Sequence, residues 1–103
     1  REEPAMPAYL IATIKVTDPE GFGEYVRQVR PMVARFGGRY LVGGSAFDSV
    51  EGEPAPDVLA VLEFADMPAL RAFYDSADYA PLLALRQASA VSHVVLADGV
   101  PAR

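Results

Sequence analysis

The sequence predicts an α+β fold, a ferredoxin-like βαββαβ sandwich, because one unit of strand, amphipathic helix and strand occurs twice along the chain. The first unit has an alternating apolar run, a helical pattern closed by a Gly-Gly pair and a second short run, and the second unit repeats this order. Such a four-stranded antiparallel sheet carries helices on one face only, which leaves the other face for water, a ligand or another subunit. The expected strands are residues 9–16, 39–44, 58–64 and 91–97.

Length and composition favour one globular domain over residues 1–103. The chain is 51% hydrophobic and 22% charged, which is typical of a folded domain and not of a disordered chain. A domain of this size buries only about 60 to 65% of its unfolded surface, so a dimer that buries a further sheet face would add stability.

Charge and residue usage exclude several classes of partner. Nine Lys and Arg against fourteen Asp and Glu give a net charge of −5, which repels nucleic acid and anionic lipid. No apolar run approaches the ~18 residues that span a bilayer. The lack of cysteine excludes disulfides and thiol catalysis and fits a cytoplasmic location. The chain begins with Arg1 and shows no signal-peptide pattern, which leaves a removed leader as an open alternative.

Cap and turn residues mark the first helix. Asp18 is a good N-cap, and Pro19 suits the first helical position because its missing N–H has no partner to lose there. Pro31 lies inside the pattern, so we expect a kink there, and Gly37 supplies the left-handed residue that ends the helix. One helix face is apolar and should pack on the sheet; it comprises Phe22, Tyr25, Val26, Val29, Met32, Val33 and Phe36.

The second half of the chain holds a polar connection and two short helices. Residues 45–57 are acidic and contain two prolines, which is typical of a hairpin connection, and Phe47 and Val50 would extend the preceding strand. Asp66 is expected to cap the first short helix and Asp78 the second.

Strand alternation sorts candidate functional residues onto the faces of the sheet. In residues 9–16 the even positions are apolar and should meet the helices, which places Thr13 on the other face. On that face Glu63 and His93 would be the catalytic proton-transfer groups, and we expect burial to raise the pKa of Glu63. Arg39 would hold a carboxylate or enolate. The structural alternative is an ion pair between Glu63 and Arg39, with His93 as an ordinary strand residue.

A second set of candidate residues surrounds the bend between the two short helices. Tyr74 and Tyr79 either pack with their hydroxyls hydrogen-bonded or touch a ligand. Arg86 either fixes the bend by a charge-assisted hydrogen bond or lines the mouth of a pocket, and Ser76 belongs to the same unit.

Short motifs spread over the chain give a further signal. They comprise Gly37-Gly38-Arg39-Tyr40, Glu51-Gly52, Glu63-Phe64, Phe73 to Tyr79, Leu82, Leu85-Arg86 and Asp98-Gly99. The Tyr-x-Ser-x-x-Tyr element with its downstream Leu-Arg is the most specific of them. Over residues 9–99 the sequence thereby resembles the bacterial family called domain of unknown function 1330.

The resemblance implies the dimeric α/β-barrel superfamily, in which two sheets pack face to face across a twofold axis. That superfamily holds cofactor-free monooxygenases, muconolactone isomerase-like enzymes and haem-dependent members, whereas the family itself has no assigned reaction. Gly43 stands where an arginine often follows the Gly-Gly-Arg strand, so no anion-binding role carries over to that position.

Residue chemistry narrows the function to two classes. One histidine and no cysteine are too few ligands for a metal site or a haem, and residues 58–64 lack the stacking aromatics of an RNA-recognition motif. The first class is a cofactor-free enzyme, isomerase- or monooxygenase-like, that binds a small carboxylate or aromatic carbonyl compound in the barrel cavity. The second is a non-catalytic homodimeric module that binds a small ligand or only assembles.

Overall fold

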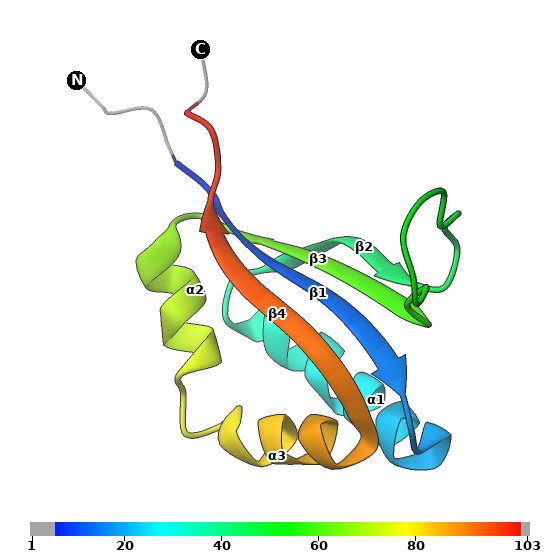
Figure 1. Cartoon of the computed structure of the whole chain (residues 1–103). Coiled ribbons are helices and arrows are strands. Elements are labelled where there is room, and N and C mark those ends of the chain that lie inside the picture. The colour runs from blue at the N-terminus through cyan, green and yellow to red at the C-terminus, as the bar shows by residue number, and fades with distance from the viewer. Residues whose placement is uncertain (1–5, 102–103) are drawn as a thin grey trace, which may run out of the picture.

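The computed structural model describes residues 6–101, and its element order is the predicted one. The four strands form one antiparallel sheet in the order β2-β3-β1-β4, and all three helices cover the same face (Figure 1). The predicted ferredoxin-like α+β fold is therefore confirmed. The elements are β1 (Ala8–Val16), α1 (Pro19–Arg35), β2 (Arg39–Gly44), β3 (Val58–Phe64), α2 (Met67–Tyr74), α3 (Ala80–Ser89) and β4 (Ala90–Asp98).

Strand β1 lies in the middle of the sheet and decides which face is covered. Its even-numbered side chains face the helices, and all of them are buried except the half-buried Val16 at the end of the strand. Three of its odd-numbered side chains, Ile11, Thr13 and Lys15, are exposed on the other face. The predicted alternation of this strand is confirmed. The core that forms over the buried side contains Leu10, Ile14, Phe22, Val29, Val33, Leu62, Phe64, Leu70, Phe73 and Leu82.

The helix caps agree with the sequence in part. The Asp66 carboxylate accepts a hydrogen bond from the Ala69 N–H at 2.9 Å and caps α2 as predicted. Asp18 occupies the N-cap of α1, but its side chain makes no capping hydrogen bond. The prediction for Asp78 was wrong: Tyr79 is the N-cap of α3, and the Asp78 carboxylate instead lies 3.0 Å from the Arg35 guanidinium.

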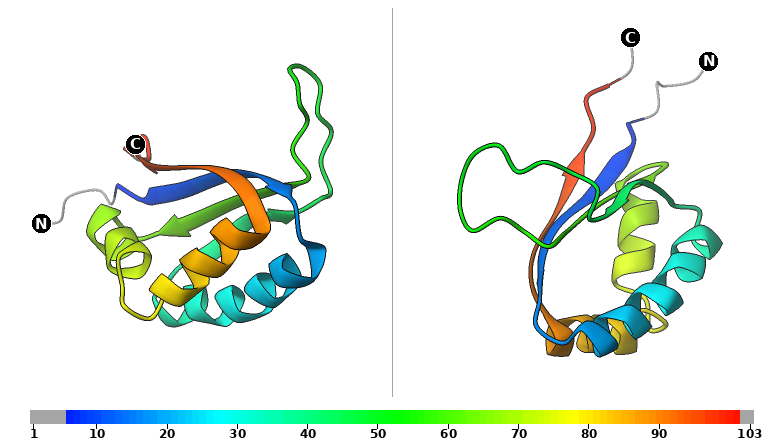
Figure 2. Two further views of the ribbon diagram at one scale, coloured as in Figure 1. Left: turned by 60° about the horizontal axis from the view of Figure 1, so that its bottom comes forward. Right: turned by 90° about the vertical axis from the view of Figure 1, so that its right-hand side faces the viewer.

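Helix α1 runs through Pro31 without interruption and ends where Gly37 adopts a φ of 87°. Residues 45–57 form no strand, so the expected extension of β2 through Phe47 and Val50 was wrong. The connection projects from the end of the sheet toward the side that carries no helices (Figure 2). No helix in residues 6–101 is long and apolar enough to cross a bilayer.

The two N-cap aspartates give a matched test of the capping geometry. Replacing Asp66 by Ala removes a hydrogen bond to an otherwise free helix N–H, so we expect the free energy of unfolding to fall by about 1 kcal/mol. Asp18→Ala removes no such bond and should cost less. Urea unfolding of both variants checks this, and equal losses would show that the bond contributes nothing.

Candidate functional site

The four polar strand residues that the sequence singles out lie on the helix-free face, but they form two separate pairs there. Strand pairing sets Thr13 opposite His93 and Arg39 opposite Glu63. Glu63 is also the partner of Tyr9, four residues before Thr13 on β1, which corresponds to about 13 Å along the strand. An acid, a base and an anion holder are therefore not gathered at one point on this face.

The Glu63 carboxylate is held by two donors. The Arg39 Nε lies 2.8 Å from one carboxylate oxygen, and the Tyr9 hydroxyl donates to the other at 3.0 Å. The hydrogen bond from Arg39 and then that from Tyr9 lower the pKa of Glu63. The expected rise of this pKa by burial was wrong, because both donors stabilise the ionised carboxylate. The geometry is that of the ion-pair alternative, and a catalytic role for Glu63 stays a prediction.

His93 and Thr13 lie beside a shallow groove under the 45–57 connection. The groove is lined by these two residues, Lys15, Val91 and residues 54–56. Lys15 donates to the carbonyl of Ala55 at 3.1 Å and faces the Asp57 carboxylate at 3.4 Å, so its charge is already compensated. The side chain of His93 is exposed. Its role as a proton-transfer group is untested.

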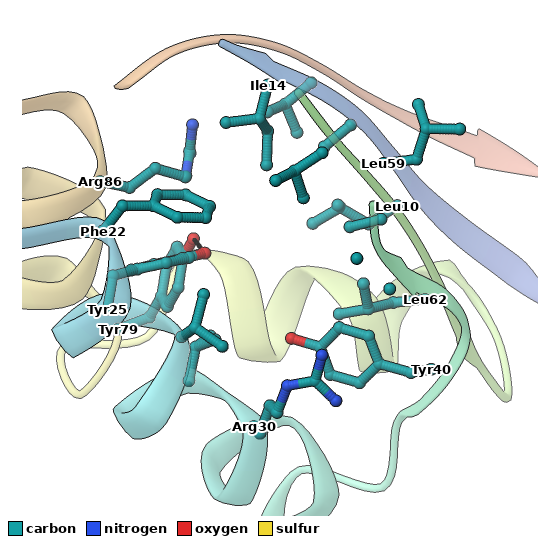
Figure 3. Close-up of a pocket in the computed structure, with 18 of the residues that line it drawn as sticks. Leu10, Ile14, Phe22, Tyr25, Arg30, Tyr40, Leu59, Leu62, Tyr79 and Arg86 are labelled. Atoms are coloured by element: carbon teal, nitrogen blue, oxygen red, sulfur yellow. Dashed lines mark hydrogen bonds between the residues drawn. The ribbon is translucent and has the colours of Figure 1, made fainter. Parts of the chain in front are cut away.

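A deeper space lies on the other face of the sheet, between the strands and the helices (Figure 3). We call it the cavity; its volume is about 130 Å³. It lies between α1, whose buried side chains Phe22, Tyr25 and Val29 form one wall, and strands β1, β2 and β3. Most of its wall is apolar, and its lining includes Leu10, Ala12, Ile14, Phe22, Tyr25, Val26, Val29, Tyr40, Ala60, Leu62, Phe73, Tyr79 and Val94.

Among the lining residues only Arg30 of α1 and Gly43 of β2 are exposed. The cavity therefore opens between α1 and β2, and we call this opening the mouth. The Arg30 guanidinium lies over the ring of Tyr40, 4.8 Å from its centroid, beside the mouth.

The inner end of the cavity holds a buried cation among tyrosine hydroxyls. Arg86 is only 5% exposed and donates to the Tyr74 hydroxyl at 3.3 Å. Close to it, the hydroxyls of Tyr25 and Tyr79 are hydrogen-bonded to each other at 2.8 Å (Figure 3). Within residues 6–101 no carboxylate lies within ion-pair distance of Arg86.

The pKa shifts of these groups keep Arg86 charged and the tyrosine hydroxyls protonated. Burial tends to lower the pKa of Arg86, but the neighbouring Tyr79, Tyr25 and Tyr74 hydroxyls outweigh it and raise this pKa. Burial raises the pKa of Tyr25 strongly and that of Tyr40 to about 12. At neutral pH the inner end of the cavity thus presents the Arg86 guanidinium and several O–H groups.

The bend between α2 and α3 places Tyr79 in the cavity wall. The Ser76 hydroxyl donates to the carbonyl of Phe73 at 2.8 Å and accepts from the N–H of Tyr79 at 3.1 Å. Ser76 does not line the cavity. Its two hydrogen bonds instead stabilise the backbone of the bend. The predicted set Tyr74, Ser76, Tyr79 and Arg86 is thus in contact as a unit, while its ligand-binding role stays untested.

Three residues of this cavity were missed by sequence reasoning. Tyr25 counted only as part of the apolar helix face, and Arg30 and Tyr40 received no role. A basic residue next to that apolar face was an available signal, but the space between α1 and β2 cannot be seen in the sequence. No group of three or more His, Asp or Glu suited to a metal occurs in the described part of the chain.

Comparisons with known proteins agree with this architecture. The RPA0582 protein of unknown function from Rhodopseudomonas palustris has 16% sequence identity and a TM-score of 0.76, over 98% of this chain and 88% of that chain. SnoaB, a cofactor-independent oxygenase from Streptomyces nogalater, has 19% identity and a TM-score of 0.63, over 96% and 95% of the two chains. At such identities the likeness shows the fold alone.

No curated protein matches the sequence. Residues 7–100, however, match the family described as domain of unknown function (DUF1330). This match spans nearly the whole chain and agrees with the motifs around the α2–α3 bend. The chain therefore belongs to the DUF1330 family.

Proposed function

We propose that this protein binds a small molecule with an aromatic or similarly apolar body and an acidic group, such as a carboxylate or an ionised carbonyl, in the cavity. The observation that carries the proposal is Arg86, a buried cation without a carboxylate partner in the described residues. Tyrosine hydroxyls stabilise this guanidinium, but no opposite charge faces it among the described residues. An anionic ligand in the cavity would supply that charge through a charge-assisted hydrogen bond.

The rest of the cavity suits the body and the oxygen atoms of such a ligand. Its volume of about 130 Å³ is close to that of a cavity that accommodates benzene, so it suits a compound about one ring in size. Tyr25 and Tyr40 stay protonated at neutral pH. The Tyr40 hydroxyl, and whichever hydroxyl of the Tyr25–Tyr79 pair accepts from the other, can donate to a ligand. A guanidinium and neutral hydroxyls together favour an oxyanion over a neutral oxygen.

An enzymatic form of this function is a cofactor-free isomerase or monooxygenase-like reaction in which the cavity stabilises an enolate or phenolate. The structural likeness to SnoaB, a cofactor-independent oxygenase, is compatible with this form. In it, Arg86 and the tyrosine hydroxyls would stabilise the substrate anion. Glu63 and His93 do not line this cavity, so a proton-transfer role for them would need a separate site on the helix-free face.

A non-catalytic binding module is the second candidate, and one observation favours it. The cavity lining contains no Asp, Glu or His, so no ordinary general base faces a ligand there. A bound anion would then be held and not transformed.

We also propose that two copies form a homodimer through their helix-free sheet faces. Apolar side chains on this face are exposed, among them Ile11, Val42, Val91 and Val95 at 39%, 41%, 69% and 53%. The 45–57 connection projects to the same side and would border the partner (Figure 2). A stable interface of this kind typically buries about 1,500 Å² in total.

Ligand binding is tested by thermal melts with benzoate and its neutral counterpart benzamide. We expect benzoate at tenfold excess over its Kd to raise the Tm of the wild type by about 5 °C or more, and benzamide to have little effect. Arg86→Met should abolish the benzoate shift, because it removes the buried cation. Arg71→Met makes the same charge change on the exposed surface of α2 and should leave the shift intact.

A folded Arg86→Met variant, judged by circular dichroism, is needed for this comparison, and Arg86→Gln serves if that variant does not fold. Equal Tm shifts with benzoate in the wild type and in the Arg86 variant would overturn the proposed role of Arg86. The absence of any shift with benzoate and a panel of other aromatic acids would overturn the proposed function.

The homodimer is tested by light scattering at micromolar concentration. We expect a mass of twice the 11.1 kDa of the chain. Val95→Glu places a charge next to Ile11 on the apolar face and should shift the mass toward the monomer, because a buried unpaired carboxylate is costly. Gln87→Glu adds the same charge on the exposed surface of α3 and should not. A monomeric wild type would contradict the proposed dimer.

A further inference from the structure

The positive charges of residues 6–101 are paired with carboxylates except at the cavity. Among residues 6–101, each Lys and Arg outside the cavity lies within 4 Å of a carboxylate oxygen. These paired cations are Lys15, Arg27, Arg35, Arg39 and Arg71. The two cations of this part of the chain that lack such a partner, Arg30 and Arg86, both line the cavity.

This distribution is unexpected for an acidic protein. With a net charge of −5, carboxylates outnumber cations, so an unpaired arginine is not explained by a shortage of acids. Exposed Arg30 alone would be unremarkable because water solvates it. Arg30, however, lies beside the mouth of the same cavity that buries Arg86. A ligand of this cavity would explain why both arginines lack a carboxylate partner.

The two guanidiniums lie at opposite ends of the apolar space. Arg86 extends from α3 at the inner end, and Arg30 lies with Tyr40 at the mouth, with the apolar side chains between them (Figure 3). Gly43 contributes to the position of Arg30: a Cβ there would lie 2.9 Å from Cδ2 of the Tyr40 ring and 3.4 Å from a terminal guanidinium nitrogen of Arg30. Glycine therefore lets both side chains lie against β2.

We infer that the ligand of the cavity is a dianion, a compact apolar body with one acidic group for Arg86 and a second for Arg30. This inference rests on the proposed function and specifies its ligand class as dicarboxylates or equivalent diacids. The inner acid group is desolvated and neutralised by the buried guanidinium, whereas the outer one stays partly in water. The outer contact is accordingly the weaker of the two and the more sensitive to salt.

The test compares linear α,ω-dicarboxylates of increasing length with the monomethyl ester of each, by calorimetric titration of the full chain. We expect one length to bind best and to bind about three- to tenfold tighter than its monoester, as one partly screened charge-assisted contact would provide. Arg30→Met should abolish this preference while leaving binding of the monoester unchanged. Raising the salt concentration should weaken the diacid more than the monoester.

Arg27→Met is the matched control, because it removes the same charge from the same helix at an exposed position paired with Glu24 and outside the cavity. It should keep the preference for the diacid. Equal affinity of diacid and monoester in the wild type, or a preference that persists in Arg30→Met, would overturn the dianion while leaving the proposed function standing. Binding of neither class to the wild type would overturn both.

Discussion

The alternation of β1 is the constraint on which the rest of this structure depends. Because this strand pairs with β3 on one side and β4 on the other, its register fixes which side chains of both neighbours share a face. Its buried side is wholly apolar and includes the small residues Ala8 and Ala12, so the helices can cover only that face. A register shift of one residue would turn Thr13 and Lys15 into the core. Burying these polar side chains without partners is unfavourable, so other registers of this strand are disfavoured.

The cavity results from uneven packing of the helices over that face. At one end, Phe73 stacks on Phe64 with ring centroids 5.5 Å apart and contacts Tyr79 at 4.7 Å, so this part of the core is filled by aromatic rings. Between α1 and β2, the side chains leave the cavity open. The core thus has a tightly packed part and an open part beside it. Tyr79 belongs to both, because it contacts Phe73 and also lines the cavity.

Much of the fold could be predicted from the sequence because its signals are local. The bounds of β2 and β3 match the expected residues, and the alternation of β1, the cap at Asp66 and the turn at Gly37 follow from the chemistry of single residues. The resemblance at the α2–α3 bend identified Tyr79 and Arg86 as a unit, and the structure places them in contact with the cavity.

What could not be predicted depends on contacts between distant segments. The low pKa of Glu63 requires Tyr9 and Arg39, 54 and 24 residues away in the chain, to converge on one carboxylate. Asp78 was expected to cap a helix because the start of that helix is visible in the sequence next to it. Its actual partner, Arg35, belongs to a distant helix, and the sequence does not show that the two side chains meet. The cavity depends in the same way on the distance between α1 and β2.

The irregular register of β2 sets the width of the cavity. Between Tyr40 and Val42 the pairing with β3 shifts by one residue, so Val42 lies opposite Val61 and Gly43 opposite Ala60 on the cavity side. Without this bulge, regular alternation would bring Val42 to the cavity side in place of Gly43, and a branched side chain would occupy the entrance. The access route therefore depends on one extra backbone residue in an edge strand, so a related chain could open or close it by changing strand register while keeping the same core.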